Sequence, residues 1–164
     1  MTPEEIKEIV TSQRNFFQTG KTLQVNYRMQ ALKKLKVCIE QYESEIAEAL
    51  KKDLGKSNFE GYMCEVGLVL SEISYMLKHA PSYAKEKTVK TPIAQFRSRS
   101  YKKPSPYGVV LVMSPWNYPF LLTMDPLIDA IAAGNTVVLK PSAYSPHTTD
   151  IIAKISANVF LKLM

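Results

Sequence analysis

Two stretches indicate the fold of this 164-residue chain: Gly108-Val-Val-Leu-Val-Met-Ser-Pro-Trp-Asn-Tyr-Pro-Phe120 and Ala130-Ile-Ala-Ala-Gly-Asn-Thr-Val-Val-Leu-Lys-Pro-Ser142. Each contains a short, uninterrupted apolar run rich in β-branched residues, at 109–113 and at 136–139. Such runs are typical of strands that are buried on both faces of a parallel sheet. We therefore expect two parallel strands in this part of the chain.

A helix is expected after each of these strands. Residues 119–133 have the composition of a helix, with a kink expected near Pro126, and Gly134 is a suitable stop. Ser145-Pro146 begins another helix, in which apolar residues recur at helical spacing. Together these elements form a βαβα unit with a right-handed crossover. Two strands make a thin sheet, so we expect its faces to need further strands.

The chain before residue 84 is predicted to be helical. Thr2-Pro3-Glu4-Glu5 is a capping box with proline at the first helical position, and this helix is expected to stop at Gly20. A second helix is predicted over 23–54 and a third over 58–79, each with a broad apolar face, and Pro81 is expected to end the third. Periodicity therefore predicts three helices in this region.

The positive charge of the chain lies in one segment. Between Lys85 and Lys103 there are seven basic residues against one acidic residue, which equals the net charge of +6 of the whole chain. Thr91-Pro-Ile93 would break a helix, and Phe96-Arg-Ser-Arg-Ser-Tyr101 alternates weakly, as an exposed extended strand does. A basic patch can bind nucleic acid, but this one has no recognition motif and no array of stacking aromatic residues. Because charge runs usually mark a solvated strand or loop, we expect no nucleic-acid partner.

Length and composition indicate an ordinary globular domain. Apolar residues make up 46% of the chain and charged residues 22%. No apolar run is long enough to span a membrane, and the start Met1-Thr-Pro-Glu-Glu5 is unlike a secretory signal, so we expect a cytoplasmic protein with no membrane partner. Cys38 and Cys64 have no partners at metal-ligand spacing, so no zinc is expected. Two buried thiols are the preferred interpretation, although a disulfide between them stays open.

Candidate chemistry lies where the two predicted strands end. Ligands of doubly wound sheets gather at the carboxyl ends of the strands, where this sequence has residues 114–119 and Lys140-Pro-Ser142. Neither a G-x-G-x-x-G turn nor a phosphate-binding loop is found in the sequence. The Asn117 amide can donate a hydrogen bond to a developing oxyanion, and Lys140 can hold a hydroxyl or phosphate of a nucleotide. The alternatives are that Asn117 only caps the following helix, that Trp116 belongs to the core, and that Lys140 is simply solvent-exposed.

The two stretches quoted above, and the spacing between them, resemble the amino-terminal cofactor-binding part of aldehyde dehydrogenases. The resemblance is to the shorter, class-3-like branch, as Asp53-Leu-Gly-Lys-Ser57 with Tyr62 and Glu65 indicates, and it runs from about Ile6 to about Val159. It implies an α/β fold in which a helical amino-terminal region is followed by part of a Rossmann-like parallel sheet. The implied organisation is a partial NAD(P)-binding domain over 1–164, with a helical region at 1–84, a basic strand or arm at 85–107 and the βαβα unit at 108–164.

This resemblance implies roles for the residues after each strand. Asn117 matches the asparagine whose amide stabilises the oxyanion of the thiohemiacetal, Lys140 matches the lysine that binds the adenosine ribose, and Tyr118 would lie on the substrate side. The remaining implied cofactor-binding residues are Ser114, Pro115, Trp116 and Ser142. Many relatives have a ribose-binding glutamate where this chain has Ala143. Losing that anion makes a 2′-phosphate more acceptable, so the expected cofactor is NAD or NADP.

The implied reaction oxidises an aldehyde substrate to a carboxylic acid. A cysteine thiolate attacks the carbonyl, hydride passes to the nicotinamide, and a glutamate-activated water releases the acyl group. The family's glycine-rich turn, glutamate base and cysteine nucleophile would all follow residue 164, and neither Cys38 nor Cys64 takes the nucleophile's role. We therefore expect a fragment that is inactive alone. The alternative is a non-catalytic module that associates with a full-length relative.

The resemblance also gives the basic segment a structural interpretation. Residues 96–103 match part of the hairpin arm through which these enzymes dimerise. A homodimer is therefore expected of the full-length protein.

Overall fold

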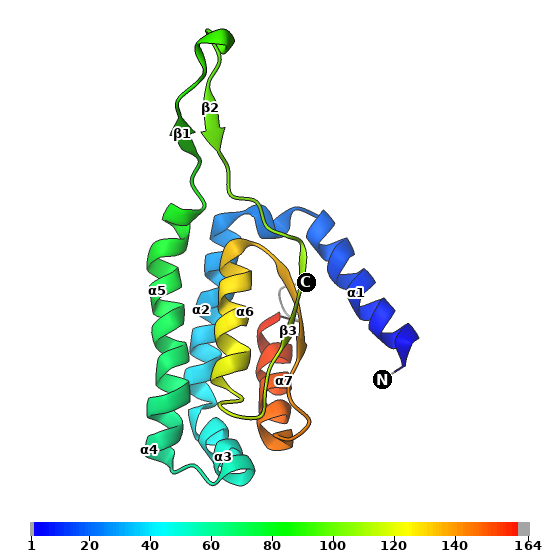
Figure 1. The fold of residues 1–164 in the computed structure, drawn as a ribbon. Helices are drawn as coiled ribbons and strands as arrows, with labels where there is room; N and C mark the ends of the chain where they lie inside the picture. Colours follow the sequence, from blue (N-terminus) through cyan, green and yellow to red (C-terminus); the bar gives the residue numbers. More distant parts are fainter. Residues whose placement is uncertain (1, 161–164) are drawn as a thin grey trace.

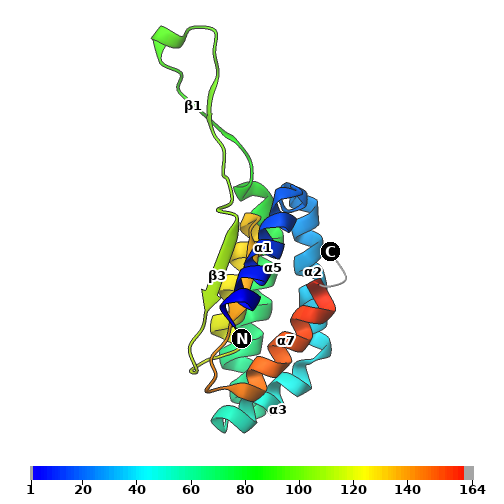
Figure 2. The same ribbon diagram turned by 90° about the vertical axis from the view of Figure 1, so that its right-hand side faces the viewer.

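The computed structural model describes residues 2–160, which form a helical body, a small parallel sheet and a projecting hairpin (Figures 1 and 2). The α-helices are α1 (Pro3–Gln18), α2 (Val25–Gln41), α3 (Glu43–Leu54), α4 (Asn58–Gly61), α5 (Gly67–Tyr83), α6 (Leu121–Ala133) and α7 (Pro146–Phe160). The strands are β1 (Lys87–Val89), β2 (Ser100–Lys102), β3 (Val109–Met113) and β4 (Thr136–Lys140), with helical turns η1 (Lys21–Leu23), η2 (Tyr62–Val66) and η3 (Ile93–Gln95). The α/β fold class is confirmed, whereas the predicted boundary at residue 164 lies outside the described residues.

Helix α1 begins with the predicted capping box. The Thr2 hydroxyl accepts a hydrogen bond from the Glu5 N–H at 3.3 Å, and the Thr2 N–H donates to the Glu5 carboxylate at 2.7 Å. Both contacts satisfy backbone or side-chain groups that the first turn would otherwise leave unpaired. The helix ends just before Gly20, whose φ of +73° is left-handed. The capping box and the stop near Gly20 are therefore confirmed.

The helix predicted over 23–54 is divided at Tyr42 into α2 and α3, so the prediction of one helix is wrong. Tyr42 has φ −98° and ψ 10°, although the sequence from 25 to 54 contains neither glycine nor proline. The break allows α3 to pack on α7, where Lys154 pairs with Glu45 at 2.7 Å. Asn158, also on α7, donates to the Tyr42 hydroxyl at 3.3 Å. Tertiary contacts with α7 accompany the break, and propensity does not signal it.

The helix predicted over 58–79 also differs from the structure. Helix α4 passes into the π-helical turn η2 before α5 begins, and α5 continues through Pro81 to Tyr83. The prediction that Pro81 ends this helix is wrong, because a proline in the last turn interrupts a hydrogen-bond ladder that is already ending. A π-turn adds one residue to the ladder and rotates the side chains that follow. Glu65 lies in this turn and is fully buried.

The predicted βαβα unit is confirmed, with β3 and β4 parallel and joined by α6. Their register runs from Val109 opposite Thr136 to Met113 opposite Lys140. The prediction that both faces are buried is wrong for β3, since Leu111 is 59% exposed and Met113 is 66% exposed. Among the described residues the parallel sheet has only these two strands, so few elements are available to cover its second face.

The core lies mainly between helices α2, α3, α5, α6 and α7. Its largest fully buried apolar side chains are Leu32, Leu35, Ile39, Ile46, Leu50, Ile73, Phe120, Met124, Ile128, Ile152 and Ile155. Cys38 is buried beside them on α2, and Cys64 is half-buried in the π-turn. No helix within residues 2–160 is both long and apolar enough to cross a membrane. The helices instead bury their apolar faces against one another.

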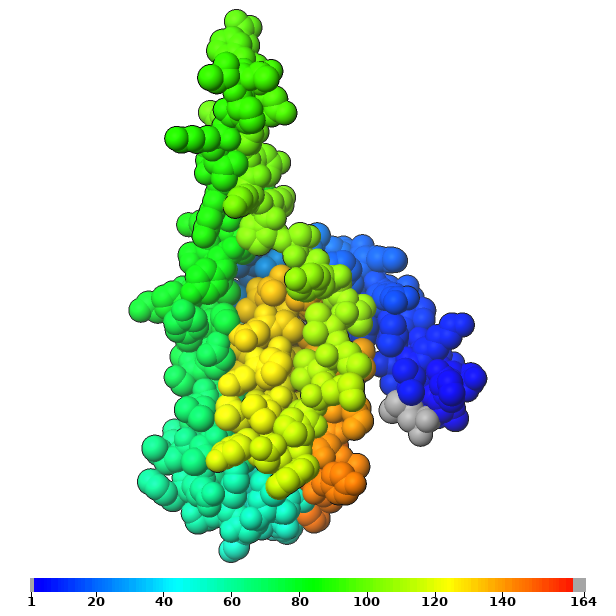
Figure 3. Space-filling model, in the orientation of Figure 1, coloured from blue at the N-terminus to red at the C-terminus, as the bar shows by residue number. Residues whose placement is uncertain are grey.

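The basic segment forms an arm, residues 85–107, that stands away from the body (Figures 1 and 3). Strands β1 and β2 pair antiparallel, with Lys87 opposite Lys102, and η3 lies at the far end. Of the exposed strand predicted over 96–101, only Ser100 and Tyr101 lie in β2, and residues 96–97 form a turn, so this prediction is confirmed only in part. Two large apolar side chains near the tip are almost fully exposed, Ile93 at 95% and Phe96 at 81%. The arm thus presents both apolar surface and positive charge to its surroundings.

Candidate functional site

The loops that follow β3 and β4 begin side by side. Met113 and Lys140 are register partners at the ends of the two strands, and the Ser114 N–H donates to the Lys140 carbonyl at 3.3 Å. The two predicted site segments, 114–119 and 140–142, therefore meet at one edge of the sheet. This is the carboxyl edge, where doubly wound folds hold their ligands.

The Ser114 side chain closes the first loop onto α6. It is buried, and its hydroxyl lies 2.6 Å from the Thr123 hydroxyl, which itself donates to the Pro119 carbonyl at 2.6 Å. Because Thr123 has a single hydroxyl hydrogen, Ser114 must be the donor in the first of these bonds. The Ser114 hydroxyl is thus occupied inside the protein, and a ligand at this edge would contact the backbone there.

The middle of the loop is open to solvent. Trp116 is 56% exposed, so the alternative that it belongs to the core is wrong. Asn117 is also exposed, and within residues 2–160 its side chain has no hydrogen-bond partner. Asn117 does not cap α6, because a carboxylate from another segment occupies that position. Its amide N–H groups are therefore available to a ligand oxygen.

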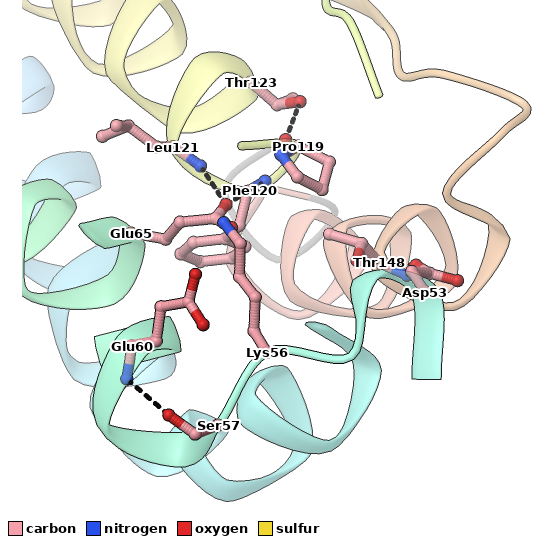
Figure 4. Close-up of polar contacts among 10 residues, drawn as sticks. All are labelled: Asp53, Lys56, Ser57, Glu60, Glu65, Pro119, Phe120, Leu121, Thr123 and Thr148. Carbon is pink, nitrogen blue, oxygen red and sulfur yellow. Dashed lines mark hydrogen bonds and ion pairs between the residues drawn. The ribbon is translucent and has the colours of Figure 1, made fainter. Parts of the chain in front are cut away.

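Glu65 is that carboxylate. Its Oε2 accepts hydrogen bonds from the Phe120 N–H at 2.8 Å and the Leu121 N–H at 3.1 Å, at the start of α6 (Figure 4). These are N–H groups that a helix amino terminus leaves unsatisfied, and a negative charge there also interacts favourably with the helix dipole. The other oxygen, Oε1, pairs with the Lys56 ammonium at 2.5 Å. A buried ion pair therefore fixes the point where the loop enters α6.

Tyr118 connects the same lysine to the loop. The Lys56 ammonium lies 4.0 Å from the centre of the Tyr118 ring, within the range of a cation–π contact. Tyr118 has φ +48°, and a non-glycine residue in this left-handed region costs on the order of 1–3 kcal/mol. Such strain persists only where the surroundings hold it, and it is concentrated at functional sites. Lys56 is one of the groups that hold it here.

Sequence reasoning used Asp53, Lys56 and Glu65 only as markers of resemblance and missed what they do. A signal was present for Glu65, which stands four residues before Val69 and eight before Ile73, on the apolar face of its helix. A carboxylate at such a position needs a buried partner. The partner Lys56 and the acceptor role at residues 120 and 121 could not be read from spacing.

Asp53 performs the equivalent task at the second loop. Its carboxylate accepts hydrogen bonds from the Thr148 N–H and the Thr148 hydroxyl, both at 2.7 Å, and from the His147 N–H at 3.2 Å. Figure 4 shows it beside the first turn of α7. Two carboxylates from the segment 53–65 therefore cap the two helices that follow the sheet strands.

The second loop leaves Lys140 exposed. Ser142 is buried, and its Oγ accepts from the Tyr144 N–H at 3.2 Å, so this side chain shapes the turn. Lys140 has no ion-pair partner among the described residues, which agrees with the solvent-exposed alternative and leaves its ammonium free to bind a hydroxyl or an anion. Ala143 is exposed nearby in the same turn. The carboxyl edge of the sheet thus presents the Asn117 amide, the Lys140 ammonium and the Trp116 indole.

Lys140 and Pro141 also line a groove of about 690 Å³. Its walls are mainly apolar and come from α1, β4 and α7, including Ile9, Val138 and Ile152. Pockets that bind small molecules combine such apolar walls with a few polar groups.

Comparisons with known proteins show which family this chain is similar to. The family model described as "Aldehyde dehydrogenase family" matches residues 1–161. The 4,4'-diaponeurosporen-aldehyde dehydrogenase of Staphylococcus aureus is 44% identical over 145 residues, which are 88% of this chain and 32% of that protein. The dimeric NADP-preferring aldehyde dehydrogenase of Canis lupus familiaris is 42% identical over 152 residues, 92% of this chain and 33% of that protein.

A solved structure is similar over the same part of the chain. Staphylococcus aureus AldH, in its substrate-bound state, superposes with a TM-score of 0.91 and 42% sequence identity. The match covers 94% of this chain and 34% of that one. The chain therefore spans about a third of the length of each of these relatives.

Proposed function

Because the chain belongs to the aldehyde dehydrogenase family, we propose that it supplies the amino-terminal part of an active site that oxidises aldehydes to carboxylic acids with NAD or NADP. The observation that carries this proposal is the exposed Asn117 amide, which has no partner within residues 2–160 and lies on the same sheet edge as Lys140. The chain spans about a third of the length of these relatives. We therefore assign the complete reaction to a protein of the relatives' full length.

Asn117 is proposed to stabilise the oxyanion. When a thiolate attacks an aldehyde carbonyl, negative charge develops on the carbonyl oxygen, and an amide N–H aimed at that oxygen stabilises the transition state. A donor whose orientation is fixed before the reaction is more effective than a mobile one, since no reorganisation is needed during the step. The hydrogen bonds that attach the loop at Ser114 and Phe120 support this role.

Lys140 is proposed to bind the adenosine ribose of the cofactor. Its exposed ammonium fits a hydroxyl or phosphate oxygen, and Ala143 adds no carboxylate that would repel a 2′-phosphate. When bound, the nicotinamide supplies the hydride acceptor of the reaction. Pro115 and Trp116 would contact the cofactor through their exposed surfaces, and Ser114 and Ser142 through their backbone, because their hydroxyls are occupied. The NADP preference named for the dog relative supports admitting both cofactors.

Tyr118 is proposed to lie on the substrate side of the loop, next to Asn117. Neither cysteine of the chain is proposed as the nucleophile, because Cys38 is buried in the core and Cys64 belongs to the π-turn. We therefore propose that residues 1–164 alone do not turn over aldehydes.

The arm favours a second, non-catalytic role in association. Its exposed Ile93 and Phe96 are apolar side chains of the kind that protein interfaces bury. We propose that the arm pairs with another subunit in a homodimer, and that the isolated chain could join a full-length relative in the same way. The word "dimeric" in the name of the dog relative supports this. Size-exclusion chromatography of the chain mixed with Staphylococcus aureus AldH tests this association. A mixed dimer should form with the parent chain and not with Phe96→Ser, and the absence of any mixed dimer would exclude the proposed association.

A chimera tests the catalytic proposal. Residues 2–160 of this chain replace the corresponding part of Staphylococcus aureus AldH, and formation of reduced nicotinamide is followed with aldehydes. We expect Asn117→Ala to lower kcat by roughly 10²–10³, the effect of losing one oxyanion donor. Lys140→Ala should instead raise the KM for the cofactor. An active chimera that is indifferent to Asn117→Ala would refute the proposed role.

A further inference from the structure

We propose that Lys56 and Glu65 are positioning residues that hold Tyr118, and through it Asn117, in the orientation that oxyanion binding requires. This inference rests on the proposed function of Asn117. Neither side chain is assigned a contact with substrate or cofactor. Their role follows from how they attach the loop between Ser114 and Phe120 to the helical body.

The loop has few attachments within the described residues. At its beginning, the Ser114 N–H and hydroxyl are held by Lys140 and Thr123. At its end, the Phe120 N–H is held by Glu65 at 2.8 Å. Between these points Trp116 and Asn117 are exposed, and Tyr118 is held at two places: the Leu122 N–H donates to its carbonyl at 2.9 Å, and its ring contacts the Lys56 ammonium. The backbone bond leaves the Tyr118 ring free to turn, so we infer that the contact with Lys56 fixes the ring and, through it, the direction of the neighbouring Asn117 amide.

One buried ion pair serves both the end and the middle of the loop. Glu65 uses one oxygen for the two N–H groups of α6 and the other for Lys56, so the rotation of its carboxylate is fixed. The same Lys56 ammonium lies 4.0 Å from the centre of the Tyr118 ring. Figure 4 shows Lys56 reaching from its own segment toward Glu65 and Phe120. Displacing either partner would remove the contact that holds the ring of Tyr118, a residue whose backbone is strained at φ +48°.

A gain in folding stability alone does not explain why the chain has a buried ion pair here. Charges taken out of water lose their hydration, and replacing a buried ion pair by apolar residues of similar volume is often neutral or stabilising. Glu65 is fully buried, and Lys56 is nearly so. A pair that gives little net stability but fixes the geometry of one loop is consistent with a positioning function.

The π-turn places Glu65 for this role. In the turn the Gly67 N–H donates to the Tyr62 carbonyl, five residues back. A Cβ on Gly67 would lie 3.0 Å from that carbonyl oxygen and 3.3 Å from the Tyr62 ring, closer than ordinary packing allows. Such single π-turns are frequent at functional sites. Glycine at 67 therefore allows the local geometry that directs Glu65 toward α6.

Trp116 provides a direct test, because it is the single tryptophan of the chain and stands next to Asn117. Its fluorescence anisotropy and its quenching by acrylamide are measured in the full chain for Lys56→Met, Lys56→Arg and Glu65→Gln. Lys56→Met removes the charge and keeps a long apolar side chain. We expect lower anisotropy and stronger quenching for Lys56→Met and Glu65→Gln, and partial return toward the parent values for Lys56→Arg, which keeps a cation.

Asp53→Asn is the matched control. It weakens a carboxylate cap of the same kind on α7, where Asp53 contacts His147 and Thr148. If all three of Lys56→Met, Glu65→Gln and Asp53→Asn lower the thermal midpoint but leave Trp116 unchanged, the pair is only structural and the inference is wrong. If Glu65→Gln does not fold, Lys56→Met decides the outcome alone.

The chimera described above separates this inference from the proposed function. A positioning role predicts that Lys56→Met lowers kcat while the KM for cofactor stays near that of the parent, with partial rescue by Lys56→Arg. Unchanged kcat in Lys56→Met, in a chimera that does respond to Asn117→Ala, would overturn the positioning role and leave the proposed function intact. Indifference to Asn117→Ala would overturn the proposed function, and the Trp116 signal would then still report whether the pair holds the loop.

Discussion

The guanidinium of Arg28 lies directly against the backbone of Gly134, where α6 turns into β4. A Cβ at Gly134 would lie 2.6 Å from Arg28 Cζ, and Gly134 has φ +95°. Arg28 is buried and donates to the Thr22 carbonyl at 2.6 Å and the Ala132 carbonyl at 3.2 Å. It joins the start of α2 to the βαβα unit, and this approach requires a residue without a side chain at 134.

Gly134→Ala should lower the free energy of unfolding more than Gly55→Ala does. Both glycines have positive φ, which costs an alanine about 1–2 kcal/mol. At Gly55, however, nothing lies within 4 Å of the added Cβ. Urea denaturation of the two variants separates the backbone cost from the contact with Arg28. Equal losses would mean that Arg28 moves aside without cost.

Asp53→Ala should destabilise the chain by about 0.5–2 kcal/mol, the usual cost of removing a helix cap. The variant leaves the N–H groups of His147 and Thr148 without their carboxylate acceptor. Glu48→Ala on the same helix is the control, since Glu48 is exposed, forms its ion pair with Lys52 four residues later and accepts no hydrogen bond from the α7 backbone among the described residues. Chemical denaturation measures both. A loss for Asp53→Ala no larger than that for Glu48→Ala would contradict the capping role.

Asp125 should make the folded chain less stable as pH rises from acidic to neutral. Burial, together with the smaller effect of the Glu72 and Asp129 carboxylates, raises the pKa of Asp125 from 3.8 to about 6. Its Oδ1 is buried without a hydrogen-bond partner among the described residues. The folded state therefore binds a proton that the unfolded state releases. This contribution to stability is fully present below pH 3.8 and is lost as pH rises through about 6.

Asp125→Asn tests the predicted direction of this pH dependence. The variant cannot carry the charge, so its thermal midpoint relative to the parent should increase as the pH is raised across that interval. Asp150→Asn, at an exposed position, should show no such trend. A difference between Asp125→Asn and the parent that is the same at acidic and neutral pH would contradict the role of Asp125.

The isolated chain should self-associate. Leu111 and Met113 leave apolar surface exposed on β3, and the groove beside β4 is largely apolar. Leu111→Glu should reduce association in sedimentation velocity, whereas Phe59→Ser, at an exposed residue outside both the groove and the arm, should not. A parent chain that is monomeric and unfolds cooperatively would contradict this prediction.

Local signals in the sequence were sufficient for several elements. The capping box at Thr2, the glycine stops at Gly20 and Gly134, and the alternation of strands and helices after Gly108 all appear as predicted. Each depends on chemistry within a few residues: a side chain that caps its own helix, or a glycine that accepts positive φ. Such elements can be read without knowing what packs against them.

The elements that were predicted wrongly depend on distant partners. The break at Tyr42 accompanies contacts with α7, and the exposure of Leu111 follows from a sheet of two strands within the described residues. In both cases packing against other elements, and not local propensity, accompanies the result.

The same division applies to the candidate site. Sequence determines that Asn117 and Lys140 follow neighbouring parallel strands, because strand periodicity and topology bring carboxyl ends together. Tertiary structure determines which side chains remain available: Ser114 and Ser142 turn inward to hold their loops, while Asn117 stays exposed. Glu65 and Phe120 are 55 residues apart in the chain, and their hydrogen bond exists only once the helices have packed. A buried charge must find its partners in space, so its role becomes visible only in the folded chain.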